Sequence, residues 1–195
     1  MVTKKSTRAK AAESIYVLRI DLAQIKPAVW RRLEVAADIT LAQLHRVIQL
    51  AFDWNDSHLH QFEIDGQLYS QSMPGSFGMD MGDLDERKFR LAAVAGVGSR
   101  FTYTYDFGDD WIHLVKAEKI LPPMPGIRYP RCAAGRNAAP PEDCGGPWGY
   151  AEMLQTLADP AHPERDELLE WLGGDFDPAA FDRQELNAGL GKLKL

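Results

Sequence analysis

The segment from Leu121 to Tyr150 restricts the possible folds of this chain more than any other stretch. It holds seven prolines and five glycines in thirty residues. Proline lacks a backbone N–H and glycine favours irregular backbone, so this density opposes both helix and sheet. We therefore expect an irregular surface loop, which separates a strand-rich region before it from a helical region after it.

Alternating apolar residues in the first part of the chain predict strands over residues 15–22 and 28–35. Residues 38–54 predict the clearest helix, because an apolar stripe follows a capping box formed by Thr40 and Gln43. Asp65-Gly66 is typical of a tight hairpin turn between two further strands. Residues 71–86 are rich in Gly, Met, Ser and Asp and predict a mobile loop of about 15 residues.

Three helices are expected after the Pro/Gly-rich loop: residues 149–159, residues 164–172, and a last helix with Asp177 as its N-cap. The element order predicts an α+β fold with a mixed, mainly antiparallel sheet and an N-terminal ββα unit of β-grasp-like arrangement. We expect residues 1–14 to form a disordered basic arm. Residues 15–195 then make a single domain whose helical part begins at about residue 149.

The charge balance limits the partners that the chain can be expected to bind. The formal net charge is −6 and the isoelectric point is near 5.4, which disfavours nucleic acid as the main partner. Contact with DNA remains open only through the basic arm with its Lys4, Lys5, Arg8 and Lys10. No apolar run approaches the ~20 residues that span a bilayer, and no hydrophobic segment follows the arm. We expect a cytoplasmic protein without a membrane partner.

Two adjacent arginines in the second predicted strand, Arg31 and Arg32, point to opposite faces of the sheet. One of them must therefore lie beside or beneath an apolar layer. A buried guanidinium without a partner is costly, so this arginine needs a carboxylate. Asp106 is the candidate for that partner.

The stretch YDFGDDWIH, residues 105–113, predicts a hairpin. A turn on Gly108-Asp109 places Asp106, Trp111 and His113 together on the face away from the core, whereas a turn on Asp109-Asp110 shifts the pairing by one step. Turn chemistry explains Asp109 and Asp110. The face with Asp106 and His113 meets either an arginine or the acidic loop further on.

Other candidate residues lie in the loop PPEDCGG and in the histidines. Glu142 and Asp143 are either a carboxylate pair for metal or acid–base chemistry, or the start of a helical turn. His45, at the edge of the apolar stripe, is more typical of a hydrogen-bonded border residue than of a ligand. A zinc site could in principle draw on His58, His60, His113, Cys132 and Cys144, although no local spacing demands it.

Five stretches together resemble the plasmid pRi open-reading-frame-three-like family, also described as passenger TnpR-like proteins of a mobile element: IKPAVWRRLEV, TLAQLHRVIQLAFDWNDSHLHQFEI, YTYDFGDDWIHLV, YPRCAAGRNAAPPEDCGGPWGY and FDPAAFD. The resemblance implies an α+β domain associated with plasmids and transposons, without an assigned reaction. We find no recombinase nucleophile motif that would carry over a resolvase activity. Many relatives have a cysteine before P-P-E-D, where this chain has Ala139, so the resemblance weakens the zinc hypothesis.

We therefore favour an accessory domain over an enzyme. We expect this domain to bind an unknown protein or small molecule in a cleft between the hairpin and the PPEDCGG loop. Its candidate residues are Arg31, Arg32, His45, Trp54, Asp106, Asp109, Trp111, His113, Glu142 and Asp143. The first alternative is a metal-dependent, hydrolase-like enzyme using Asp106, Asp109, His113, Glu142 and Asp143. The second is a mobile-element protein that contacts DNA through its arm. No cofactor is expected, and a divalent metal stays open.

Overall fold

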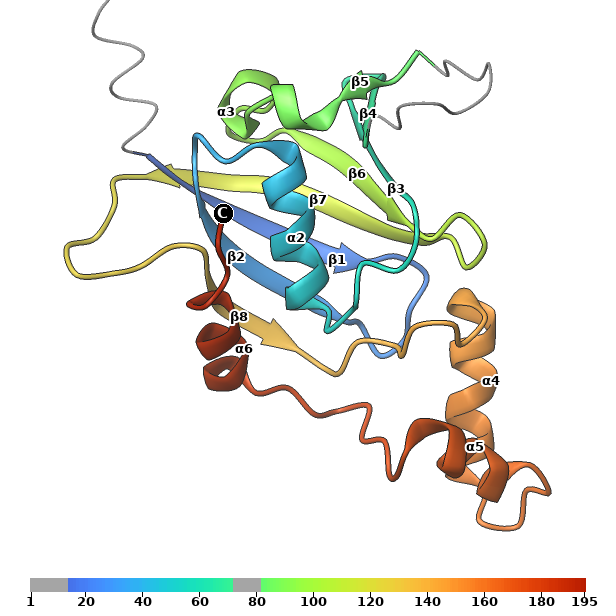
Figure 1. Cartoon of the computed structure of the whole chain (residues 1–195). Helices are drawn as coiled ribbons and strands as arrows, with labels where there is room; N and C mark the ends of the chain where they lie inside the picture. Colours follow the sequence, from blue (N-terminus) through green and yellow to red (C-terminus); the bar gives the residue numbers. More distant parts are fainter. Residues whose placement is uncertain (1–13, 72–81) are drawn as a thin grey trace, which may run out of the picture.

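The computed structural model describes residues 14–71 and 82–195 (Figure 1). The basic arm and most of the loop at residues 71–86 lie outside the described residues and stay predictions. Within the two described ranges, no helix is both long enough and apolar enough to cross a membrane.

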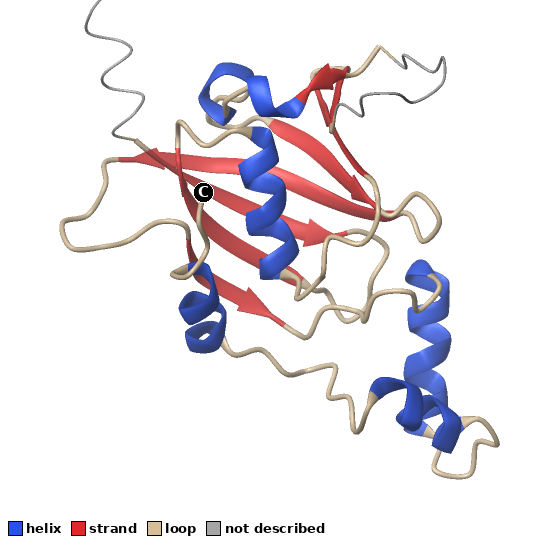
Figure 2. Ribbon diagram, viewed as in Figure 1, coloured by secondary structure: helices blue, strands red, loops and turns tan. Residues whose placement is uncertain are grey.

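One sheet organises the described residues, with the strand order β5-β4-β3-β6-β7-β1-β2-β8 (Figure 2). The strands are β1 (Ile15–Leu22), β2 (Trp30–Ala36), β3 (His60–Ile64), β4 (Gln67–Ser70), β5 (Leu84–Asp85), β6 (Arg100–Tyr105), β7 (Trp111–Leu121) and β8 (Arg131–Arg136). Every neighbouring pair is antiparallel except β4 with β5, which is parallel. The α+β class, the mainly antiparallel sheet and the opening strand–strand–helix order are confirmed.

Helices lie on one face of this sheet and beyond one of its ends (Figure 1). They are α2 (Leu41–Ala51), the 3₁₀ turn η1 (Glu86–Lys88), α3 (Leu91–Val94), α4 (Gly146–Ala158), α5 (Arg165–Leu172) and α6 (Arg183–Leu190). Helix α2 crosses the middle of the sheet, whereas α4 and α5 form a pair that projects from it. The core therefore lies between α2 and the sheet.

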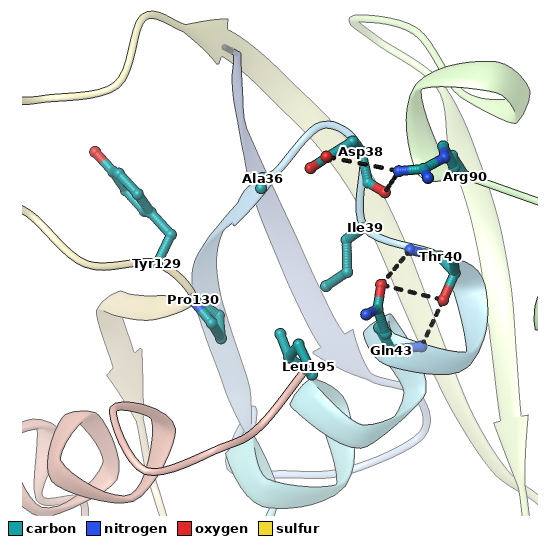
Figure 3. Close-up of a pocket in the computed structure, with 9 residues that line it drawn as sticks. All are labelled: Ala36, Asp38, Ile39, Thr40, Gln43, Arg90, Tyr129, Pro130 and Leu195. Carbon is teal, nitrogen blue, oxygen red and sulfur yellow. Dashed lines mark hydrogen bonds and ion pairs between the residues drawn. The ribbon is translucent and has the colours of Figure 1, made fainter. Parts of the chain in front are cut away.

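Helix α2 forms as its sequence predicts. The Thr40 side chain accepts a hydrogen bond from the Gln43 N–H, and the Gln43 side chain accepts one from the Thr40 N–H (Figure 3). Thr40 and Gln43 also line a pocket of about 360 Å³. The apolar stripe of the helix is fully buried against the β1 and β2 side chains Leu18, Ile20 and Leu33.

The prediction that residues 121–150 form an irregular loop is wrong in part. Strand β8 forms inside it, because residues 131–136 contain no proline and the two flanking prolines, Pro130 and Pro140, lie outside the paired stretch. Helix α4 begins within it as well, at Gly146, with Pro147 in the first turn, where a missing N–H costs nothing.

The expected last helix also begins elsewhere. Asp177 caps only a short turn through the Ala179 N–H, whereas Asp182 is the N-cap of α6 and accepts from the N–H groups of Gln184 and Glu185. Helix α6 covers the outer edge of β8. The Asn187 side chain accepts from the Cys132 N–H and donates to the Cys132 carbonyl, so one amide satisfies both groups of an edge residue.

Candidate functional site: the hairpin–helix junction

The hairpin between β6 and β7 has a different register from the one expected for a turn on Gly108-Asp109. Tyr105 pairs with Trp111 and Tyr103 pairs with His113. The loop spans residues 106–110, because Asp106 and Asp110 both adopt left-handed backbone, with φ of 56° and 55°. The prediction that Trp111 and His113 lie on the face away from the core is therefore wrong, and both side chains are buried.

His113 lies inside the aromatic core. Its Nδ1 donates to the backbone carbonyls of Tyr103 and Trp111, at 3.1 and 3.0 Å. The ring packs edge-on against Phe52 and Trp54. Burial lowers its pKa to about 4, so the ring is neutral at pH 7. His113 is thus a structural residue in this environment.

The hairpin loop contacts the start of α4 directly. The Asp109 carboxylate accepts a hydrogen bond of 3.2 Å from the Gly145 N–H. Gly146 lies against the Asp109 backbone carbonyl so closely that a Cβ at residue 146 would overlap its oxygen. We call the surface formed by residues 106–110 and 142–148 the hairpin–helix junction. The hairpin YDFGDDWIH and the loop PPEDCGG are therefore in direct contact.

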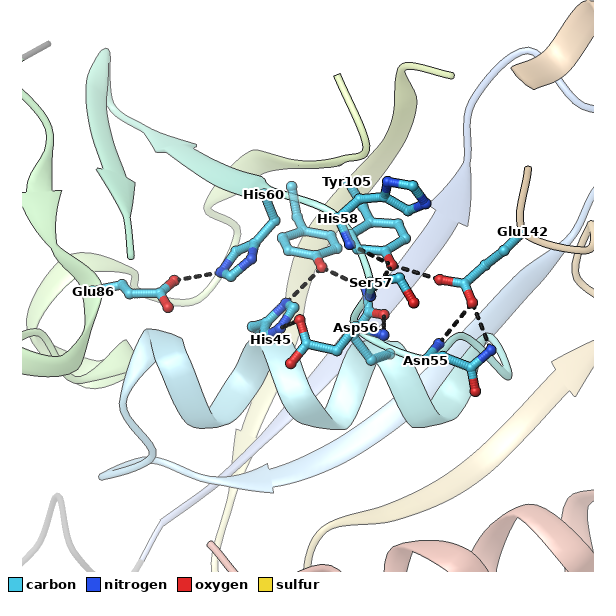
Figure 4. Close-up of polar contacts among 11 residues, drawn as sticks. His45, Asn55, Asp56, Ser57, His58, His60, Glu86, Tyr105 and Glu142 are labelled. Atoms are coloured by element: carbon cyan, nitrogen blue, oxygen red, sulfur yellow. Dashed lines mark hydrogen bonds and ion pairs between the residues drawn. The ribbon is translucent and has the colours of Figure 1, made fainter. Parts of the chain in front are cut away.

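A polar network attaches the acidic loop to the core beneath the junction (Figure 4). The Tyr105 hydroxyl donates to Glu142 Oε1 at 2.5 Å, and Glu142 Oε2 accepts from both the backbone and the side chain of Asn55. Burial and the Glu142 hydrogen bond raise the Tyr105 pKa, so the hydroxyl keeps its proton. Trp54 stacks on Tyr105 and donates from Nε1 to the Pro140 carbonyl at 2.9 Å. Glu142 is therefore a structural acceptor.

Three further side chains at the junction could hold a metal. His58 Nε2 lies 3.0 Å from Asp143 Oδ1 and 3.7 Å from Asp106 Oδ2. The three ligand atoms lie within 4.8 Å of one another. His58 Nε2 is shielded from solvent and makes no well-directed hydrogen bond to any described residue. One imidazole with two carboxylates is a donor set that suits zinc or manganese.

A second histidine cluster is buried beside the core of the sheet. The rings of His45 and His60 stack at 3.5 Å. His45 is hydrogen-bonded to the Tyr103 hydroxyl and to Asp56, and His60 is hydrogen-bonded to Glu86 (Figure 4). Burial, followed by the neighbouring His60, lowers the His45 pKa to about 4. These ring nitrogens are occupied by protein partners, which gives the pair a structural role, although His45, Asp56 and His60 also have metal-ligand spacing.

The side chains of the adjacent Arg31 and Arg32 lie on opposite faces of the sheet. Arg32 forms an ion pair of 2.8 Å with Glu118 on the sheet face opposite α2. Arg31 is buried and bonds three backbone carbonyls, without any ion pair to a carboxylate of the described residues. The prediction of a carboxylate partner thus holds for the more exposed arginine and not for the buried one. Asp106 contacts neither, so that assignment is wrong.

The expected zinc ligands do not converge. Cys132 is buried and lies 3.1 Å from the Ala134 carbonyl, whereas Cys144 belongs to the hairpin–helix junction. Burial, followed by Asp109, raises the Cys144 thiol pKa to about 12, so the thiol is neither a ready ligand nor a nucleophile. Neither cysteine joins a described group of three potential ligands.

Of the expected site residues, the structure brings Trp54, Asp106, Asp109, Glu142 and Asp143 to the junction, with Trp111 and His113 buried behind it. Arg31, Arg32 and His45 lie elsewhere. The expected site residues did not include Asn55, Tyr105 and Gln49, which hold the networks together. A signal was available for Tyr105, because a core tyrosine needs a partner for its hydroxyl.

These features define the class: an α+β protein on one mainly antiparallel sheet, with acidic and aromatic side chains at the hairpin–helix junction. The chain belongs to the family of plasmid pRiA4b ORF-3-like proteins, whose model matches residues 14–185. It is 39% identical over 183 residues to the uncharacterized protein y4hQ of Sinorhizobium fredii, covering 92% of each chain. The crystal structure of a protein of unknown function, MM3350 from Methanosarcina mazei Go1, is similar with a TM-score of 0.81 and 42% identity. That match covers 89% of this chain and 97% of the other.

Proposed function

We propose that this protein is a binding domain whose hairpin–helix junction engages a basic segment of a partner protein. The observation that carries the proposal is Trp148, in the first turn of α4, whose side chain is 84% exposed. Phe107, in the hairpin loop, is 54% exposed. Both lie within two residues of the Asp109–Gly146 contact. Exposed aromatic side chains in one region are typical of interaction surfaces, where Trp contributes strongly to binding energy.

The charge around these aromatic residues supports the choice of a basic partner. Residues 146–177, which include α4 and α5, hold eight Asp and Glu residues against one arginine, Arg165. Asp106, Asp109, Asp110 and Asp143 add further carboxylates at the junction. Lysine or arginine of a partner would gain ion pairs here and a cation–π contact on Trp148. The same charge disfavours nucleic acid.

Selection of peptides on the purified protein tests this proposal. We expect a random peptide library to yield binders rich in Lys and Arg, with affinities that fall as salt is raised. Trp148→Ala should weaken a selected peptide at least about tenfold, a loss of about 1.4 kcal/mol, in fluorescence anisotropy. Trp171→Ala on α5 removes another exposed tryptophan and is the matched control, with less than about a twofold change. Acidic binders, or equal affinity for wild type and Trp148→Ala, would contradict the proposal.

A second candidate function, metal-dependent hydrolysis, is supported by the His58–Asp106–Asp143 cluster alone. A divalent ion held there would lower the pKa of a bound water and supply hydroxide. If the cluster binds metal, Zn²⁺ or Mn²⁺ should raise the melting temperature of tag-free protein by several degrees, and Asp106→Asn should abolish the rise. Elemental analysis gives the independent readout. This function is excluded if the purified protein is metal-free and neither ion changes its melting temperature.

A further inference from the structure

Arg31 of β2 is the most deeply buried arginine among the described residues, with 4% of its surface exposed. Its Nε donates to the Ala51 carbonyl at 2.8 Å, and its Nη1 donates to the carbonyls of Trp30 and Arg136 at 2.9 and 3.0 Å. The guanidinium lies 4.3 Å from the ring centroid of Phe181. The described contacts give its Nη2 no hydrogen-bond acceptor.

This arrangement leaves a buried positive charge without an anion. Carbonyl dipoles offset part of the desolvation cost, but a buried charge is normally paired with an opposite one. Burial lowers the Arg31 pKa to about 10, and it is still protonated at neutral pH. Asp53 is the one carboxylate whose charge contributes to the Arg31 pKa, and the two side chains form no ion pair among the described residues. The position is therefore suited to an anion supplied from outside the chain.

Arg31 lines a pocket of about 670 Å³ between the end of α2, residues 176–182 and α6. This volume is in the range of small-molecule sites. Its wall is largely apolar, formed by side chains that include Leu50, Phe176 and Leu186. A ligand with an apolar body and an anionic end would therefore match both parts of the pocket.

Three exposed carboxylates restrict the charge of that anion. Asp53, Asp182 and Glu185 also line the pocket, and all three are solvent-exposed. They repel multiply charged groups such as phosphate more strongly than a singly charged carboxylate. The Asp182 side chain is already engaged as the N-cap of α6. Among the anions that Arg31 could pair with, these charges therefore favour a monoanion over a multiply charged group.

We propose that this pocket binds a small amphipathic monocarboxylate, whose carboxylate accepts a hydrogen bond from Arg31 Nη2 while its apolar body fills the space between α2 and α6. The site is separate from the hairpin–helix junction. A failure of either proposal therefore leaves the other standing.

Calorimetric titration of the full chain with decanoate and 1-naphthoate tests the proposal, with decanol, decylamine and phenyl phosphate as matched probes. We expect the carboxylates to bind at least about tenfold more tightly than decanol, decylamine or phenyl phosphate. Equal binding of decanol, tighter binding of phenyl phosphate, or no binding of either carboxylate overturns the proposal.

Variants locate the site. Arg31→Lys should weaken decanoate binding at least about tenfold. Because this change could also unfold the protein, Ala138→Leu provides a second variant, which fills the pocket and keeps the guanidinium. It should also abolish binding, while its circular dichroism spectrum stays that of wild type. Arg32→Lys is the control, since Arg32 pairs with Glu118 on the other sheet face, and its binding should be unchanged. Undiminished binding in folded Ala138→Leu places the ligand elsewhere and contradicts the assignment.

Discussion

The free energy of unfolding should fall by about 3 kcal/mol between pH 7 and pH 4 through His113 alone. Burial holds the His113 pKa at about 4 in the folded protein, below the value of about 6.5 in an unfolded chain. Between these pH values the unfolded chain binds a proton that the folded protein excludes. The stabilisation is therefore complete above about pH 6.5 and is lost as the pH falls through about 4. His45 adds to this loss with the same sign.

Urea unfolding at pH 7, 5.5 and 4.5 measures this loss. His113→Gln cannot titrate in this range and keeps an N–H donor for the two carbonyls, so its unfolding free energy should decline less steeply than that of wild type. His162→Gln, in the connection between α4 and α5, serves as the control and should keep the wild-type slope. Parallel curves for wild type and His113→Gln would falsify the assignment of the acid sensitivity to this buried ring.

Gly146→Ala should destabilise the protein by about 3 kcal/mol, a value near the upper end for a single small substitution. Two causes combine at this position. The backbone is left-handed, with φ of 68°, which costs an L-residue about 1–2 kcal/mol. A methyl group would in addition overlap the Asp109 carbonyl oxygen, so the hairpin loop and α4 must separate.

A matched glycine separates the two causes. Gly173, the C-cap of α5, has a φ of 73° and open space where a Cβ would lie, so Gly173→Ala carries the backbone cost alone, about 1–2 kcal/mol. Chemical denaturation gives both values. Equal losses for the two variants would mean that the contact between the hairpin loop and α4 contributes nothing to stability.

The sequence predicts the local structure of this protein where a short-range cause acts. The capping box at Thr40 and the turn at Asp65-Gly66 depend on neighbours within a few residues, and both form as expected. The wrong hairpin register has a cause that periodicity does not reveal. Asp106 and Asp110 both take left-handed backbone, which lengthens the loop and turns Trp111 and His113 inward. Aspartate adopts this conformation more readily than most residues, but the sequence does not mark which aspartate will do so.

In the candidate site, too, the sequence predicts some features, whereas others depend on long-range contacts. The sequence indicated that the acidic hairpin and PPEDCGG belong together, and they meet at Asp109 and Gly145. The partners of the two arginines depend instead on residues far away in the sequence. Arg31 is adjacent to Arg32 in the chain, yet one guanidinium reaches the core side and the other pairs with Glu118 on the opposite face. Whether a buried arginine finds a carboxylate or only carbonyls depends on residues 20 to 105 positions away, which no local pattern specifies.

The edges of the sheet limit how copies of this protein can associate. An open strand presents free N–H and C=O groups, which invite a strand from another molecule. At one end, β5 contains two residues and is too short to serve as a template. At the other, the Asn187 amide occupies both backbone groups of Cys132, and Arg183 donates to the Ala133 carbonyl. Helix α6 thus protects the sheet against edge-to-edge polymerisation. A chain that lost this helix would gain a tendency to aggregate and would also lose the buried Leu190 from its core.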